Sequence, residues 1–491
     1  MDLELASVAI DDGREMVEIF DELAHRPYSC FLDSSLLMPR FGDHSFIGFD
    51  PYLVLTTKGH DAVFRKRGGD ETLRRVNPFE ALSTALKSRR LPVEARPPGL
   101  PPFICGGIGY LAYELGRVIE KLPGTAADDL GLPEIAFCFF DRVITCDHTT
   151  GEKTLIVAVP VGEDPEPSIA ESLSLIEPGA SNGANGGPRQ AEPGTPLEFD
   201  SGFTREEYVE AVRKVKEYIL AGDIYQANLS QRFSAPLVEP SWQLYRRLRR
   251  LNSAPFSAYL NLGGFAVASS SPERFLKVTG SRVETRPIKG TRPRSADPTE
   301  DARLADELLS SKKDRAELSM IVDLERNDLG RVCEYGSVEV EEHAVLESYA
   351  TVHHLVSTVV GNLHEGRDMI DLLRATFPGG SITGAPKIRA MEIIDELEPT
   401  ERSVYTGGIG YLGLDGNHDI NVAIRTMIIS GGRVYFQVGG GIVADSEPEA
   451  EYQETLDKGK AMFESVTGSR QGYEPDNSES WGRKSALRRS I

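Results

Sequence analysis

Cysteine is scarce in this sequence, and its spacing excludes two kinds of stabilised domain. The chain of 491 residues has five cysteines, all widely separated and without a CxxC pair. An odd number without close pairs indicates neither a disulfide framework nor a zinc site. We therefore expect buried structural thiols at Cys30, Cys105, Cys138, Cys146 and Cys333.

Long hydrophobic runs and an excess of basic charge are lacking too. No window approaches 18 uninterrupted apolar residues, and the acidic residues 1–4 are not a basic segment leading into an apolar run. Lys and Arg total 54 against 75 Asp and Glu, a formal net charge of −21. This charge argues against a general nucleic-acid binder and against anchoring to anionic membranes. We expect a cytoplasmic protein that binds neither.

The common nucleotide-binding loops are also missing. There is no GxxxxGK[ST] motif, and the GxGxxG of residues 408–413 is followed by Asp415, Gly416 and Asn417 where a dinucleotide site needs the start of a helix. The same stretch contains an internal echo, because GGIGYL occurs at 106–111 and again at 407–412. We interpret the echo as two similar sheet corners in two lobes.

Composition changes along the chain predict an α+β protein with two folded parts. Residues 1–161 alternate short β-type runs with turn signals, which is typical of a largely antiparallel N-terminal sheet. Residues 162–201 are rich in Pro, Gly and Ser and are predicted to be a flexible linker. Within the linker, Ile169, Leu173 and Ile176 recur at helical spacing, which is compatible with a short docked helix. Residues 202–468 form the second domain, opening on a T-x-x-E capping box at Thr204, and residues 469–491 are a predicted disordered tail.

The most unusual stretch is 286–294, RPIKGTRPR, which holds four cations and two prolines in nine residues. Neighbouring cations and burial both disfavour the ammonium form, so Lys289 is a candidate amine nucleophile near neutral pH. The alternative is a basic loop that binds anions or water.

Glutamates on two predicted helices are candidate metal ligands. Glu317 lies on a helix expected over about 298–328, and Glu451, Glu454 and Lys458 share one stripe of a final helix that starts at Ser446. Carboxylates from separate helices suit Mg²⁺, which takes one or two of them and completes its shell with water and substrate oxygens. Taken singly, a glutamate of this kind is more often a solvated surface charge.

A buried cation and two glycine-rich segments indicate an anionic ligand. Arg425 interrupts the run 421–429, which otherwise reads as a buried strand, so its charge needs either a ligand or a structural carboxylate. Gly439–Gly441 offers backbone amides that a small anion can approach. The turn 378–387 leads into a helix over 388–397. Together these features predict a Mg²⁺-dependent site for a small, multiply anionic molecule.

Seven motifs in this order resemble the chorismate-utilising enzyme family over about residues 203–467. They are IYQANLSQRF at 224–233, SPE at 271–273, PIKGT at 287–291, DRAE at 314–317, VDLERND at 322–328, PGGSITGAPK at 378–387, and EYQETLDK at 451–458. The resemblance implies two stacked, mostly antiparallel sheets flanked by helices, with the site between the lobes.

The resemblance also implies roles for single residues. Glu317 and Glu454 would hold Mg²⁺ against the ring carboxylate of chorismate, with Glu451 nearby. The remaining substrate-binding groups would be Tyr405, Arg425 and the Gly439 amide at the enolpyruvyl carboxylate, Lys458 as added positive charge, and Thr383 and His354 along the ring.

Two positions separate branches of the family. Anthranilate synthases usually carry alanine where this sequence has Lys289, and the isochorismate- and salicylate-forming enzymes use a lysine base at the position of Gln226. The sequence therefore looks most like the aminotransferase branch that makes 4-amino-4-deoxychorismate for p-aminobenzoate and folate synthesis. In the implied mechanism Lys289 attacks ring C2, Glu273 assists departure of the C4 hydroxyl as general acid, and ammonia adds at C4 and expels the lysine.

No cysteine lies in a Gly-x-Cys-x-Gly setting, so we expect ammonia from a partner glutamine amidotransferase subunit. Residues 31–34 resemble the L-E-S element with which family members bind tryptophan, so Ser34 marks a possible tryptophan pocket, although Asp33 replaces the glutamate. One alternative is an anthranilate-forming component. The other is a catalytically silent regulator, which would have a broken ligand set.

Overall fold

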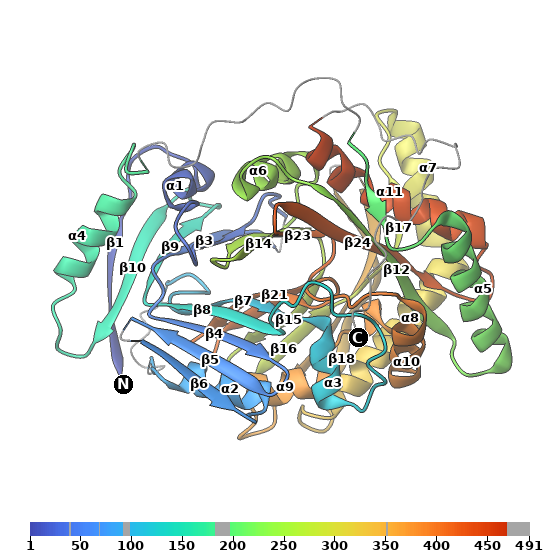
Figure 1. The fold of residues 1–491 in the computed structure, drawn as a ribbon, viewed down its shortest axis with the longest axis horizontal. Helices are drawn as coiled ribbons and strands as arrows, with labels where there is room; N and C mark the ends of the chain where they lie inside the picture. Colours follow the sequence, from blue (N-terminus) through green and yellow to red (C-terminus); the bar gives the residue numbers. More distant parts are fainter. Residues whose placement is uncertain (39–40, 68, 92–98, 182–196, 350–351, 469–491) are drawn as a thin grey trace, which may run out of the picture.

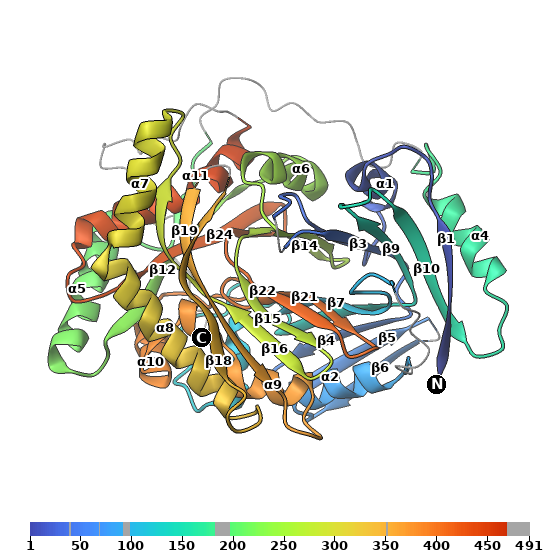
Figure 2. The same ribbon diagram turned by 180° about the vertical axis from the view of Figure 1, so that it is seen from behind.

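The computed structural model describes residues 1–38, 41–67, 69–91, 99–181, 197–349 and 352–468. Two large, mostly antiparallel sheets lie face to face, and helices cover their outer faces (Figures 1 and 2). The predicted α+β fold is therefore confirmed. No helix of the described part is long and apolar enough to cross a membrane.

The first sheet runs from the N-terminal strand to β11. In spatial order its strands are β1 (Leu3–Ala9), β10 (Lys153–Pro160), β9 (Arg142–Asp147), β3 (His44–Gly48), β2 (Cys30–Asp33), β13 (Phe256–Asn261), β14 (Phe265–Ser271), β23 (Thr426–Ser430), β24 (Arg433–Ile442), β12 (Gln226–Pro236) and β11 (Asp200–Ser201), with β20 (Gly384–Ala385) beside β12.

The second sheet contains the lysine-bearing strand at one edge. In spatial order its strands are β17 (Ile288–Pro293), β19 (Val352–Asn362), β16 (Arg282–Arg286), β15 (Arg274–Thr279), β22 (His418–Val422), β21 (Gly408–Gly413), β7 (Gly106–Leu111), β8 (Ile135–Phe140), β4 (Leu53–Lys58), β5 (Asp61–Lys66) and β6 (Gly69–Arg74), with β18 (Glu339–Ser348) beside β19.

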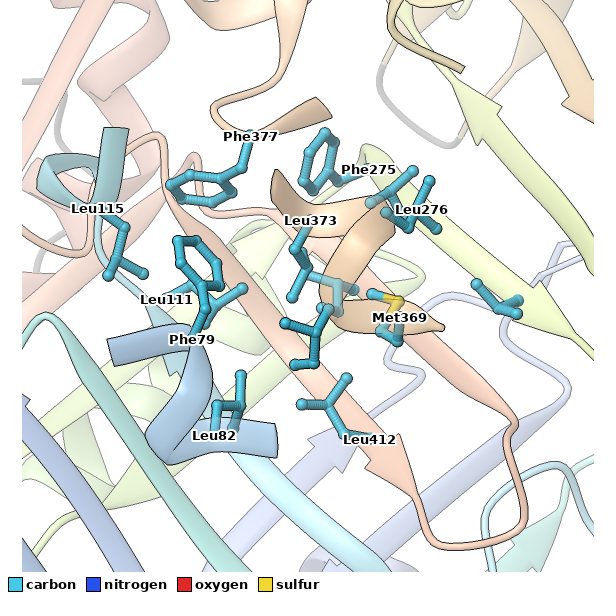
Figure 3. Packing of buried hydrophobic residues seen from close by; sticks show 14 of the residues in the cluster. Phe79, Leu82, Leu111, Leu115, Phe275, Leu276, Met369, Leu373, Phe377 and Leu412 are labelled. Atoms are coloured by element: carbon cyan, nitrogen blue, oxygen red, sulfur yellow. The ribbon is translucent and has the colours of Figure 1, made fainter. Parts of the chain in front are cut away.

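Helices seal the outer face of each sheet with apolar side chains. Those packed on the first sheet are α1 (Met16–Leu23), α4 (Glu166–Leu175), α5 (Arg205–Ala221), α6 (Ser241–Leu251), α10 (Lys387–Leu397) and α11 (Pro448–Thr467). Those on the side of the second sheet are α2 (Pro78–Lys87), α7 (Pro298–Ser310), α8 (Lys312–Gly330) and α9 (Met369–Thr376), with the short segments η2 (Tyr113–Leu115), α3 (Gly116–Ile119) and η3 (Gly380–Ile382) in the connections. In Figure 3, Phe79 and Leu82 of α2 face Leu373 of α9 across Leu111 and Leu412 of the sheet.

The repeated GGIGYL motif lies at the centre of the second sheet. Strand β7 pairs antiparallel with β21, so that Gly106 opposes Gly413 and Leu111 opposes Gly408. The prediction of two separate sheet corners is wrong, because the copies pair with each other where the two halves of the chain meet. Each of the two sheets contains strands from residues 1–161 and strands from residues 202–468.

The segment predicted as a linker begins with ordered structure. Helix α4 forms where the spacing allowed one and buries Ile169, and the backbone N–H groups of Gly179 and Ser181 donate to the Glu22 carboxylate. Residues 182–196 and the predicted tail 469–491 lie outside the described residues. The division into lobe, linker and catalytic domain stays a prediction.

One predicted helix start is confirmed, and one predicted helix is divided in two. Thr204 and Glu207 form the predicted capping box of α5. All five cysteines are buried, and none of them forms a disulfide bond within the described residues. The single helix expected over 298–328 is instead α7 and α8, because Ser311 has an extended backbone and its side chain accepts the N–H of Asp314 as a new N-cap.

Candidate active site

Three predicted metal ligands converge on two glycines of β24. A Cβ on Gly440 would lie 3.2 Å from Glu451 Oε2 and 3.4 Å from Glu454 Oε1 of α11. A Cβ on Gly441 would lie 3.1 Å from Glu317 Oε1 of α8 and would overlap the Gln226 side-chain amide. Without side chains, this segment lets carboxylates from two helices approach one stretch of backbone. The strands and helices involved all belong to residues 202–468, whereas the resemblance implied a site between the lobes.

Lys289 points into this site from β17. Its Nζ lies 2.9 Å from Glu317 Oε1, and Gln226 Nε2 donates to the same oxygen at 2.7 Å. Burial by itself favours the neutral form of Glu317, but Lys289 and the other donors outweigh it and lower the pKa of this carboxyl. The Lys289 side chain is only 13% exposed. The candidate nucleophile Lys289 and the candidate metal ligand Glu317 are therefore direct neighbours.

The predicted crowding of Lys289 by like charges is wrong. Arg286 pairs with Glu342 and Glu347, and Arg294 pairs with Asp301. Arg292 is likewise held by carboxylates of α7 and α8. Acidic side chains that follow between 7 and 61 residues later in the chain neutralise this basic stretch, and the composition of the stretch itself did not reveal them.

Glu273 is a buried carboxyl in the connection between β14 and β15. It is 5% exposed. Burial raises its pKa to about 7, against the opposing effects of a hydrogen bond with Ser381 and the charge of Lys289. A carboxyl with this pKa is substantially protonated at neutral pH, which is what a general acid requires.

Arg425 lies where the chain crosses from one sheet to the other. The run 421–429 is not one strand, because β22 ends at Val422 in the second sheet and β23 begins at Thr426 in the first. Arg425 adopts a φ of 53°, which is uncommon for a residue with a side chain. Its Nη1 donates to the Lys458 carbonyl, and no carboxylate of the described residues forms an ion pair with it. Burial lowers the pKa of Arg425. A half-buried arginine without a carboxylate partner is suited to bind an anionic ligand.

Two further predicted groups lie beside this cation. Lys458 Nζ pairs with Glu454 Oε1 at 2.6 Å and donates to the Gly439 carbonyl at 3.0 Å. Tyr405 is buried, which raises the pKa of its phenol to about 12 and keeps it a neutral donor. This corner of the site therefore gathers the polar groups predicted for a carboxylate.

The two residues predicted along the ring are buried and neutral. Burial, reinforced by the charge of Arg425, lowers the pKa of His354 to about 4, and its Nδ1 lies 2.8 Å from Thr291 Oγ1. The Thr383 hydroxyl donates to the Gly379 carbonyl at 3.0 Å. Thr383 therefore contributes shape rather than a free donor.

The donor set is compatible with Mg²⁺. The described residues contain no group of three His, Cys, Asp or Glu side chains close enough to hold a metal by themselves. Mg²⁺ needs only one or two protein carboxylates and keeps water and substrate oxygens for the rest of its shell. Glu317 and Glu454, with Glu451 beside them over the glycine segment, provide such a set from two helices.

Several residues that shape the site were not predicted. Arg402 is 2% exposed and binds Glu398, the Ile382 carbonyl and the Asn228 carbonyl, so it joins the η3 turn to β12. The i,i+4 spacing of Glu398 and Arg402 was an available signal. Asn228 itself lies on the same strand face as Gln226, and the period of two in β12 was an available signal for it.

Ser34 lies apart from these groups, at a cavity of about 110 Å³ lined by both sheets. Its hydroxyl donates to the His44 carbonyl at 2.6 Å. Both carboxylate oxygens of Asp33 are bound by Arg249, and Tyr245 donates to one of them. Tryptophan binding there stays a prediction.

Comparisons with known proteins agree with the motifs. Residues 33–464 match the chorismate binding enzyme family. The chain is 42% identical to aminodeoxychorismate synthase component 1 of Escherichia coli (strain K12), over 89% of this chain and 93% of that one. It is 43% identical to anthranilate synthase component 1 of Thermus thermophilus, over 92% and 95%. Anthranilate synthase component I from Streptococcus pneumoniae TIGR4 superimposes with a TM-score of 0.72 at 31% identity, covering 86% of this chain and 92% of that chain. The chain therefore belongs to the chorismate binding enzyme family, as a chorismate-utilising enzyme of the anthranilate and aminodeoxychorismate synthase component I type.

Proposed function

We propose that this chain is the component of an aminodeoxychorismate synthase that converts chorismate and ammonia to 4-amino-4-deoxychorismate. The observation that carries the proposal is Lys289, whose amine lies in the site at 2.9 Å from Glu317. Overall similarity does not separate the two branches, because relatives with either name are 42–43% identical. Lys289 favours the aminodeoxychorismate branch, since the resemblance implies alanine at this position in anthranilate synthases.

In the proposed reaction the chain supplies the first nucleophile and the acid. Lys289 attacks ring C2, and Glu273 donates its proton to the departing C4 hydroxyl, which leaves as water. Arg425, the Gly439 amide and Tyr405 hold the enolpyruvyl carboxylate, while His354 and Thr383 line the ring. Each of these groups is buried or half-buried, so the site excludes most water from the ring.

Mg²⁺ is the proposed cofactor, held by Glu317 and Glu454 with Glu451 nearby. It would supply a Lewis acid that fixes the ring carboxylate of the substrate. In the structure, Glu317 Oε1 already accepts hydrogen bonds from Lys289 and from Gln226, so a metal ion would compete with these two donors.

Ammonia is proposed to come from a partner glutamine amidotransferase subunit. The names of the relatives support this, since each is a component 1.

The test is the covalent intermediate. With chorismate and Mg²⁺ but no ammonia, the protein should gain the mass of chorismate less one water, detected on the intact chain and mapped to Lys289. Lys289→Ala and Lys289→Arg should form no adduct, because neither side chain offers a neutral amine. Lys460→Ala, which removes an exposed lysine of α11, is the matched control and should behave as wild type.

Product analysis decides between the two branches. Wild-type protein with ammonium should give 4-amino-4-deoxychorismate, and Lys289→Ala should lose most of it. If wild type gives mainly anthranilate and the alanine variant is unaffected, the lysine is part of a basic loop and the protein is an anthranilate synthase component.

A further inference from the structure

Asn228 carries a buried hydrogen-bond acceptor that nothing in the described residues satisfies. Its Oδ1 is enclosed and has no partner. Its backbone is fully engaged, with the N–H donating to the Thr383 carbonyl at 2.8 Å and the carbonyl accepting from Arg402 at 2.6 Å. A buried amide oxygen without a donor is costly, so such an atom in a site indicates a missing ligand.

The position of Asn228 in β12 directs this oxygen into the site. Ala227 and Leu229 pack outward against α5 and α10, so residues 226, 228 and 230 share the inner face. Directly opposite Asn228 in the neighbouring strand is Gly441, one of the two glycines under the glutamates. The side-chain amide of Gln226 and the carboxylate of Glu317 lie over this glycine.

Gln226, the next residue on the same face, has a second unsatisfied acceptor. Its Nε2 donates to Glu317, which fixes the orientation of the amide and turns Oε1 away from that carboxylate. Gln226 is 1% exposed, and Oε1 has no partner among the described residues. Ser230, the third residue on this face, is satisfied by Glu398. The face therefore presents two neighbouring acceptors that have no partner among the described residues.

We propose that Asn228 is a positioning residue for the nitrogen nucleophile, its Oδ1 accepting an N–H bond from ammonia beside Gln226. The inference rests on the proposed function. Ammonia has three N–H donors and one lone pair, so acceptors on the protein turn the lone pair toward the ring. Its lone pair then forms the C4–N bond, the two ring double bonds shift, and the C2–N bond to Lys289 breaks. The protonated lysine nitrogen leaves as a free amine, and the new amino group carries the proton.

The experiment separates the two displacements. The adduct is first formed without ammonia, and ammonium is then added in increments while adduct decay and product are followed. Asn228→Leu and Asn228→Val remove the acceptor, Asn228→Asp keeps one, and Asn362→Leu makes the same amide-to-leucine change at an exposed end of β19. Thermal unfolding of each variant reports on folding.

We expect both apolar variants to form the adduct and to need about tenfold more ammonium for the same decay rate, the effect of one lost hydrogen bond. Water should then capture a larger share of the adduct. Asn228→Asp should stay near the wild-type ammonium dependence, and Asn362→Leu should match it.

The inference is overturned if the ammonium titrations of the apolar variants superimpose on that of wild type. It is also overturned if these variants slow adduct formation but keep the wild-type ammonium dependence, because Oδ1 would then bind a substrate hydroxyl. Absence of any adduct in wild type would instead refute the lysine mechanism. The ammonium concentration at half-maximal turnover would still test Asn228 in that case.

Discussion

The protonation of Glu273 should set the alkaline limit of the reaction. Burial raises the pKa of this carboxyl to about 7, so at pH 7 about half of the molecules carry the proton. An exposed glutamate, with a pKa near 4.3, would be protonated in only about one molecule in 500 at that pH. Burial thus enlarges the acid-form population roughly 250-fold. Above pH 7 the protonated fraction falls about tenfold for each pH unit.

The assay is single-turnover consumption of chorismate between pH 5.5 and 9, in wild type and in Glu273→Gln. Wild type should lose rate through a midpoint near pH 7 on the alkaline side. Glu273→Gln should be about 10²- to 10⁴-fold slower, the usual contribution of a general acid, and should lack that midpoint. The reasoning fails if the variant keeps the same alkaline midpoint or if its rate is close to that of wild type. Thermal unfolding controls for loss of fold.

Two further predictions concern the frame and the metal. Arg402→Met should lower the free energy of unfolding by about 3–5 kcal/mol, because it leaves the buried Glu398 carboxylate unpaired, and a loss below about 1 kcal/mol in urea denaturation would contradict this. Glu317→Gln and Glu454→Gln should each raise the Mg²⁺ concentration needed for half-maximal activity and weaken thermal stabilisation by Mg²⁺, and chelation should abolish wild-type turnover. Full activity of either variant at limiting Mg²⁺ would refute its assignment as a ligand.

Local sequence patterns predicted the elements better than their connections. The capping box at Thr204 depends on contacts three residues apart, and the structure has it as predicted. Two predictions were wrong, the single helix over 298–328 and the single strand around Arg425. In each case a local feature interrupts the predicted element. The side chain of Ser311 caps the start of α8 within the predicted helix, and the backbone at Arg425 turns from one sheet to the other. Neither outcome follows from hydrophobic periodicity, because one break depends on a single side-chain cap and the other on a single backbone conformation.

The candidate site was predictable in its members but not in its pairings. The motifs supplied Glu273, Lys289 and Glu317, yet the contact between Lys289 and Glu317 joins a strand edge to a helix and depends on tertiary packing. The same holds for the acids that neutralise Arg286, which follow it by 56 and 61 residues. Asn228 was missed because its importance rests on what it lacks, and a missing partner is visible only in three dimensions.

The charges of the site balance before any ligand enters. Three carboxylates, Glu317, Glu451 and Glu454, face three cations, Lys289, Lys458 and Arg425, and Glu273 is the fourth acid, neutral when protonated. Under the proposed function, a substrate with two carboxylates and one divalent cation adds a net charge of zero. Binding both together therefore keeps the site neutral, whereas either one alone would leave uncompensated charge beside its buried or half-buried groups, such as Glu273 and Lys289. This arithmetic favours mutual enhancement of chorismate and Mg²⁺ binding, and it gives Glu273 a reason to stay protonated until the hydroxyl leaves.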